Sequence, residues 1–242
     1  MASASIAING GTLTGQNISL AASATANVSI AFATQMDGQL NFGEVAATSE
    51  VFITVDGAAS ITASGDLTII AISDITTIVS RGTQTDGDGS NDKDQDAAIA
   101  ASVIASQATV TIGDTAALTA GDDAVIVAQN IVDVTTIADG LQGDADGGAI
   151  VATSVVEGNT LVLVEDSAAI TATNLLTLAA LTDRSVTTTA IATPGGATDD
   201  GDASTTTQGQ SMTGTPLVRS RSPVRVARMS ESPVRWRSIM RQ

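Results

Sequence analysis

The chain lacks two residue types on which many functional sites depend, because none of its 242 residues is cysteine or histidine. Disulfides, metal sites built from thiolate or imidazole, and nucleophiles activated by histidine are therefore excluded. Aromatic residues are scarce as well, with three Phe, one Trp and no Tyr. A core made almost wholly of Ala, Val, Ile and Leu suits a thin, layered repeat better than a large globular interior.

Proline is absent from the first 193 residues, and long apolar runs are missing throughout. No uncharged apolar stretch reaches the roughly 18 residues that a membrane-spanning helix needs. The opening sequence MASASIAING has no basic segment of the kind that begins a secretory signal. We expect this segment neither to insert into a membrane nor to carry its own export signal.

Basic residues are nearly missing from most of the chain. Only Arg81, Lys93 and Arg184 precede Pro216, against 25 acids, which gives residues 1–216 a net charge of −22. Residues 217–242 hold seven arginines and one glutamate, a net charge of +6. An acidic body of this kind repels nucleic acid and anionic membranes, so we expect no nucleic-acid partner for it.

A repeated unit organises the first 213 residues. The pattern of an aliphatic residue, Thr, a small residue, a polar turn and an apolar run occurs four times, centred on Leu13, Ile61, Leu118 and Ile170. The intervals between these centres are 48, 57 and 52 residues. The repeat predicts one solenoid region with units at about 1–48, 49–105, 106–157 and 158–213.

Alternation of apolar and polar residues, as in Val51–Val55, predicts strands throughout the repeats. Segments that are almost continuously apolar, such as Val125–Val127, favour parallel sheets. One unit cannot bury its apolar face alone, so the units are expected to stack with equivalent aliphatic residues one above another. The predicted fold is an all-β parallel β-helix with acidic loop excursions, and repeated β-sandwich units are the alternative. Phe32, Phe42 and Phe52 are expected to fill the core near one end of the stack.

Acidic, glycine-rich segments recur at one position of each repeat, at 83–96, 140–149 and 194–205. In the first of them, aspartates alternate with glycine and polar residues as in oxygen-ligand calcium loops. The candidate calcium ligands are Asp86, Asp88, Asp92, Asp94 and Asp96. The segment has neither the closing glutamate of an EF-hand nor the nonapeptide of calcium-binding β-rolls, and a solvated excursion without a metal is the alternative.

The tail, 214–242, is a different kind of sequence, with two SPVR strings, many arginines and no strand alternation. It is predicted to be a disordered basic segment. If it is a genuine part of the protein, its composition is similar to that of a nucleic-acid-binding arm. We favour another interpretation, in which the tail is translated in a shifted frame. The nucleotide sequence would decide between the two.

The repeats IGDTAALTAGDDAVIVAQ, ITVDGAASITASGDLTIIA and LVEDSAAITATNLLTLAA resemble those of giant bacterial surface proteins, the filamentous haemagglutinin-like adhesins and β-strand-repeat proteins. The resemblance covers about residues 1–213. It implies a right-handed parallel β-helix, a secreted or cell-surface location, and a role in adhesion to host or matrix surfaces, glycans or neighbouring cells, as part of a longer parent chain. It supplies no catalytic motif.

Two other functions are compatible with the sequence. A β-helix enzyme acting on acidic polysaccharides would need paired carboxylates, which are plentiful, and basic residues to hold the substrate, of which residues 1–213 contain three. A calcium-stabilised spacer would have no recognition role of its own. We expect a non-enzymatic, adhesive segment with no cofactor other than a potential calcium ion.

Overall fold

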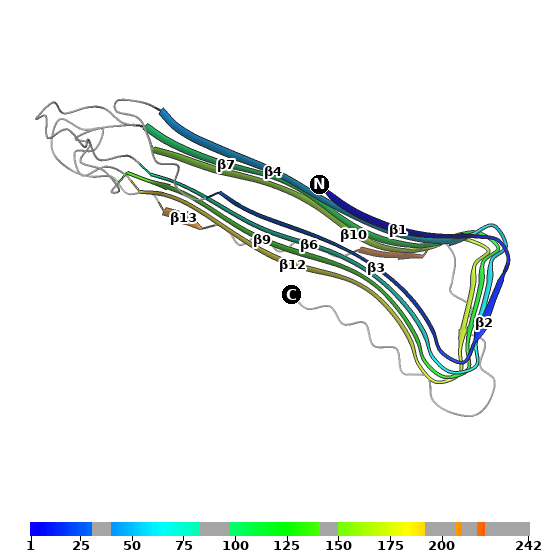
Figure 1. Cartoon of the computed structure of the whole chain (residues 1–242). Coiled ribbons are helices and arrows are strands. Elements are labelled where there is room, and N and C mark those ends of the chain that lie inside the picture. Colours follow the sequence, from blue (N-terminus) through cyan, green and yellow to red (C-terminus); the bar gives the residue numbers. More distant parts are fainter. Residues whose placement is uncertain (31–39, 83–96, 141–149, 192–206, 210–216, 221–242) are drawn as a thin grey trace, which may run out of the picture.

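The computed structural model describes residues 1–30, 40–82, 97–140, 150–191, 207–209 and 217–220. Within these ranges all regular structure is β-strand, and twelve of the strands form three parallel sheets (Figure 1). Each repeat contributes one strand to each sheet and does not fold into a sandwich of its own. The prediction of an all-β, solenoid-like stack of parallel strands is confirmed.

Two long sheets face one another and are joined at one end by a short third sheet (Figure 1). Sheet A contains β1 (Ala2–Asn9), β4 (Leu40–Asp56), β7 (Ala97–Ile112) and β10 (Ile150–Val164). Sheet B contains β2 (Thr12–Gly15), β5 (Ser60–Ala63), β8 (Ala117–Ala120) and β11 (Ala169–Ala172). Sheet C contains β3 (Ile18–Ile30), β6 (Leu67–Gly82), β9 (Ala124–Asp139) and β12 (Leu176–Ile191).

The register of the strands matches the spacing of the sequence repeat. Leu13 pairs with Ile61, Ile61 with Leu118, and Leu118 with Ile170, so the four repeat centres lie in one column. Between the first two coils the offset is 47 residues in sheet A, 48 in sheet B and 49 in sheet C. It grows because each of the two turns in the first coil is one residue shorter than its equivalent in the second.

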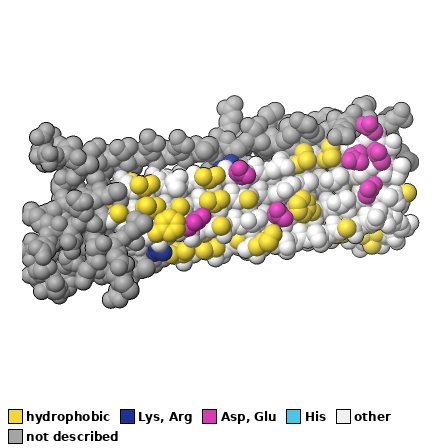
Figure 2. Space-filling view, turned by 90° about the horizontal axis from the view of Figure 1, so that it is seen from above, with side chains coloured by type: hydrophobic (Ala, Val, Ile, Leu, Met, Phe, Trp, Pro, Cys, Tyr) yellow, Lys and Arg dark blue, Asp and Glu magenta, His cyan; other side chains and the backbone are white. Residues whose placement is uncertain are grey.

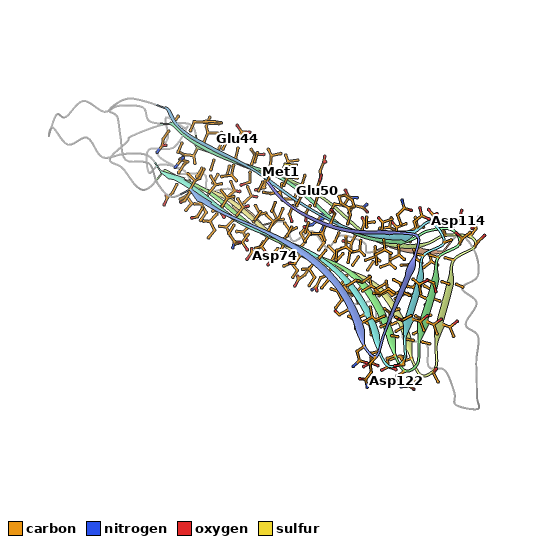
Figure 3. All side chains as sticks on the ribbon, turned by 45° about the vertical axis from the view of Figure 1, so that its right-hand side comes forward. Met1, Glu44, Glu50, Asp74, Asp114 and Asp122 are labelled. Atoms are coloured by element: carbon orange, nitrogen blue, oxygen red, sulfur yellow. The ribbon has the colours of Figure 1, made fainter. Side chains whose placement is uncertain are left out.

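Burial alternates along the strands as the period of two requires. In β6 and β9 every second side chain is buried, and Leu67, Ile69 and Ile126 have no exposed surface. One apolar cluster fills the space enclosed by the three sheets, and a second lies farther along, between sheets A and C (Figure 3). Stacking therefore converts the aliphatic positions of each repeat into a continuous interior.

Buried polar side chains separate the two apolar clusters. The Ser73 hydroxyl lies 2.8 Å from both the Ser49 and the Ser106 hydroxyls. Ser106 donates to Asn130 Oδ1 at 2.6 Å, and Asn130 Nδ2 donates to the Ser106 carbonyl at 3.2 Å. All four residues are buried, and these contacts join sheets A and C within and between coils, so each polar group is satisfied where water is absent.

The aromatic prediction is wrong for Phe42, whose side chain is 52% exposed on the outer face of sheet A. Phe52 also occupies an outward position, since the buried residues Val51 and Ile53 flank it and point inward. Phe32 lies outside the described residues. Phenylalanines ten residues apart have the same parity along a strand, and here that parity is the outer one.

Two short strands extend the stack beyond the fourth coil. β14 (Leu217–Ser220) pairs in parallel with Leu161–Val164 of β10, in the place of a fifth strand of sheet A. β13 (Thr207–Gly209) pairs antiparallel with β12. Residues 217–220 belong to the segment predicted as a tail, and their backbone follows the pattern of the repeats.

Candidate functional site

The five predicted calcium ligands, Asp86, Asp88, Asp92, Asp94 and Asp96, lie outside the described residues. The described residues on either side of such segments lie at the ends of the long strands, on the side of each coil away from sheet B. There Gly82 pairs with Asp139 and Asp139 with Ile191, where the strands of sheet C finish, and Ala97 and Ile150 begin strands of sheet A. We call this the excursion end. The calcium prediction stays a prediction.

A different acidic group lies at the corner between sheets B and C. Carboxylate oxygens of Asp66, Asp122 and Asp123 are all within 4.8 Å of one another, and Figure 3 shows Asp122 at this corner. Oxygens so placed suit a hard cation such as calcium. Aligning the repeats could have indicated part of this cluster from the sequence. Asp66 and Asp123 immediately precede the paired residues Leu67 and Ala124, so they occupy equivalent positions.

Hydrogen bonds between coils account for two of these carboxylates. Asn17 Oδ1 accepts from the Asp66 backbone N–H at 3.0 Å, and Asp66 Oδ1 accepts from the Asp123 N–H at 3.3 Å. Asp123 Oδ1 in turn accepts from the Leu175 N–H at 3.1 Å. A ladder of Asn and Asp side chains thus satisfies backbone donors that the turn leaves without strand partners. The cluster has a structural explanation that needs no ion.

The corner between sheets A and B has a similar arrangement. Asp114 Oδ1 accepts from the Ser167 N–H at 3.2 Å, and Glu165 Oε2 accepts from the Asp114 N–H at 3.3 Å. Within one turn, Asp56 Oδ1 accepts from the Gly57 N–H at 2.7 Å. Gly57 has φ of +64°, a conformation that glycine adopts without steric cost. The acids at both corners therefore hold successive turns together.

Arg81 and Arg184, two of the three basic residues before Pro216, occupy inward positions of sheet C that other repeats fill with apolar residues. Arg81 is in the column of Ala138 and Ala190, and Arg184 is in the column of Ile75 and Val132. Each faces a glycine across the interior, because a methyl group at Gly43 would overlap the Arg81 guanidinium and one at Gly158 would overlap that of Arg184. The sequence signal for this pairing is a glycine where neighbouring repeats have alanine or serine.

Burial affects the ionisation of Arg184. Its Nε is buried and has no hydrogen-bond partner among the described residues. Burial lowers the pKa of its guanidinium below the usual value, because the charged form loses solvation. An inward arginine in the last complete coil therefore costs stability that the valine of the preceding coil does not.

The outer face of sheet A combines apolar columns with acidic side chains (Figure 2). Phe42 pairs with Ile99 and Ile99 with Val151 in one column, and two positions along the strand are Glu44, Ala101 and Thr153. Four residues beyond Phe42 a third column contains Ala46, Val103 and Val155. These nine outward positions, which we call the sheet A patch, contain seven apolar residues. Phe42, Val103, Val151 and Val155 are 52%, 43%, 46% and 49% exposed.

An open groove adjoins this patch farther along the strands. Its walls are formed by Glu50, Ala105, Ser106, Gln107, Glu157, Gly158 and Asn159. Amides and carboxylates of this kind can hydrogen-bond a polar ligand. No basic side chain is among the described residues that form these walls, although the Arg184 guanidinium lies against Gly158.

These features define a protein class at the level of the fold: a β-solenoid-like stack with acidic corners and one partly apolar outer face. Comparison with known proteins adds no narrower identity, because no family model, no curated protein and no solved structure matches the chain. A helix that could span a membrane is not found among the described residues.

Proposed function

We propose that this chain is a structural and adhesive segment of a large fibre that a bacterium secretes or displays on its surface. The observation that carries the proposal is the register of the four coils, in which every long strand of the second and third coils has a parallel partner on both sides. Such a ladder can be extended by adding repeats, and each added repeat lengthens a rod. The resemblance of the repeats to those of large bacterial adhesins supports the same role.

A strand added after the fourth coil supports the proposal further. β14 adds a parallel strand to sheet A next to β10, in phase with the earlier coils. We propose that the coils wind right-handed, since parallel crossover connections almost always do. In this proposal the acidic, glycine-rich segments at the excursion end are presented to surfaces, glycans or other cells.

A polysaccharide-cleaving enzyme is a second candidate, and the groove containing Glu50 and Glu157 favours it. Glycoside cleavage requires an acid and a base or nucleophile on opposite sides of the bond. Release of reducing ends from acidic and neutral polysaccharides by the purified chain, lost in Glu50→Gln and Glu157→Gln, would support this candidate. We expect no release, because the described residues that form the groove include Glu50 and Glu157 and no basic side chain to position an acidic glycan.

Labelling of intact cells tests the fibre proposal. Antibodies against the purified chain, detected by immunogold electron microscopy, should mark extended structures outside unpermeabilised cells of the source organism. Deleting the gene should remove the label and reduce attachment of the cells to surfaces. Label confined to permeabilised cells would contradict the proposal.

A calcium-stabilised spacer gives a different set of results. Calcium would raise the melting temperature of the purified chain, because a ligand that binds only the folded state stabilises it. Deleting the gene would remove the label in this case too, but purified chain coated on beads would not promote their attachment to cells. Attachment of the coated beads with no effect of calcium would favour the adhesive segment.

A further inference from the structure

We propose that the sheet A patch binds a protein partner that presents an extended strand of the pattern apolar–x–Arg/Lys–x–apolar. The inference rests on the proposed function for its premise that this chain binds other macromolecules, and it names the chemistry of one partner. It concerns the outer surface of sheet A, which is separate from the acidic corners and begins next to the excursion end.

Clustering is the first observation behind this inference. Among the described residues, seven large hydrophobic side chains are exposed, and four of them, Phe42, Val103, Val151 and Val155, belong to the patch. They are in register on three adjacent strands and are not scattered singly over the surface. Contiguous exposed apolar surface of this kind marks interaction sites in soluble proteins.

The spacing of the outward side chains along a strand determines which shape of partner fits the patch. Outward residues along one strand are two positions apart, so Phe42, Glu44 and Ala46 follow one another at intervals of about 6.7 Å. A partner strand that runs along β4 would place alternate side chains at the same interval. Two apolar side chains of the partner would then contact the flanking columns, and the residue between them would face Glu44.

Charge decides the chemistry of the partner. Glu44 is exposed within the patch, and Glu50 and Glu157 are nearby on the same face. Arg81 and Arg184 extend from sheet C and their guanidinium groups lie against Gly43 and Gly158 of sheet A, so basic side chains are visible beside this face (Figure 2), but Glu44 is the charged residue within the patch itself. A cation in the middle of the partner strand would therefore gain a carboxylate partner, while an acid would meet a like charge.

Other occupants fit less well. A second copy of the chain would bring further glutamates into the interface, and an anionic lipid surface would be repelled by the same charges. A glycan would find one aromatic side chain, Phe42, at the edge of the patch and few hydrogen-bonding groups within it, since Glu44 and Thr153 are its only polar residues. A cationic strand uses both the aliphatic columns and Glu44.

A labelled β-hairpin peptide, each strand of which reads Val-Thr-Arg-Thr-Val, tests the inference by fluorescence anisotropy with the full chain. A matched hairpin with Glu in place of Arg is the control ligand. We expect the Arg hairpin to bind and the Glu hairpin not to bind. Glu44→Gln should weaken binding about fivefold, the upper end for an exposed ion pair, and added salt should weaken binding by the wild-type chain.

Variants of matched chemistry locate the site. Val103→Thr combined with Val155→Thr keeps the β-branched shape, removes two apolar contacts and should weaken binding about tenfold. Ile78→Thr and Asp133→Asn are the controls, because Ile78 is 45% exposed and Asp133 is an exposed acid, both on the outer face of sheet C. These two should bind the hairpin as the wild-type chain does. Circular dichroism and melting temperature verify that each variant is folded.

Four outcomes would overturn the inference. They are no binding of the Arg hairpin, equal binding of the Glu hairpin, equal binding by the Val103 and Val155 double variant, and self-association in sedimentation that this double variant abolishes. The last would assign the patch to a second copy of the chain. None of them would alter the location of the fibre on intact cells, so failure of this inference is distinguishable from failure of the proposed function.

Discussion

The four repeat centres form one column, so the energy of stacking can be measured by making the same Leu→Ala change at two of its positions, one buried and one partly exposed. Leu118 is 1% exposed and lies between Ile61 and Ile170, whereas Leu13 occupies the same column in the first coil and is 38% exposed. Leu118→Ala removes a side chain that has neighbours above and below. The vacated volume would be an enclosed cavity, so we expect a loss of about 3 kcal/mol, within the range for buried leucines.

Leu13→Ala is the matched control, because the residue type, sheet and column are the same. Part of the Leu13 side chain is already in contact with water, and the space that it leaves would be open to solvent. The cavity contribution is therefore missing, and the loss should be about 1 kcal/mol from the reduced burial alone. The difference between the two variants isolates the benefit of being covered on both sides.

Urea unfolding followed by far-ultraviolet circular dichroism measures both losses. With a slope of about 2 kcal/mol per molar urea, Leu118→Ala should lower the midpoint by about 1.5 M, and Leu13→Ala by about 0.5 M. The slopes must also be compared, because stacked repeats can unfold in parts. Equal midpoint shifts for the two variants, or a loss below about 1 kcal/mol for Leu118→Ala, would refute the stacked column.

Substitutions at three further positions probe the interior and the corners. Arg184→Val should stabilise the chain by about 1 kcal/mol in thermal or urea unfolding, because it removes a buried Nε that has no hydrogen-bond partner among the described residues. The lowered pKa of this partly solvated guanidinium has the same sign, since the charged form is disfavoured at every pH below that pKa, and no gain would contradict the inward position. Gly121→Ala should destabilise by about 2 kcal/mol, since its methyl group would overlap the Ser64 carbonyl oxygen, and a neutral effect on the melting temperature would show that the turn can move. Asp123→Ala should cost about 1 kcal/mol by removing the acceptor of the Leu175 N–H, whereas Asp123→Asn, which keeps an acceptor, should cost less than half of that; equal losses would argue against the ladder.

The repeat and its phase could be read directly from the chain. Alternation has a period of two in any strand, so residues such as Leu67 and Ile69 could be assigned to one face without knowledge of their neighbours. Residues that recur at one position of each unit must be stacked if the units pair lengthwise, and this assigned Leu118 to the column of Ile61 and Ile170.

Which face of a strand is buried cannot be read from the local sequence alone. Val125, Ile126 and Val127 are all aliphatic, yet only Ile126 is fully buried, because the opposing sheet is present on its side alone. The prediction that Phe42 is in the core failed for a related reason. Its apolar character suggested burial, but it lies on the face of sheet A that no other sheet covers. A side chain's parity is a property of the strand, but the location of the second sheet is a property of the whole coil.

The sequence by itself determined the all-β class, the four repeats, their register and the acidity of the chain, because these follow from local periodicity and composition. Only the tertiary structure decided that Arg81 and Arg184 face glycines across the interior, that Asp66 and Asp123 bond successive turns, and that Val103 and Val155 are exposed. Each of these depends on which segments meet across sheets or between coils. Contacts of that kind are set by the packing of distant strands, which no local pattern records.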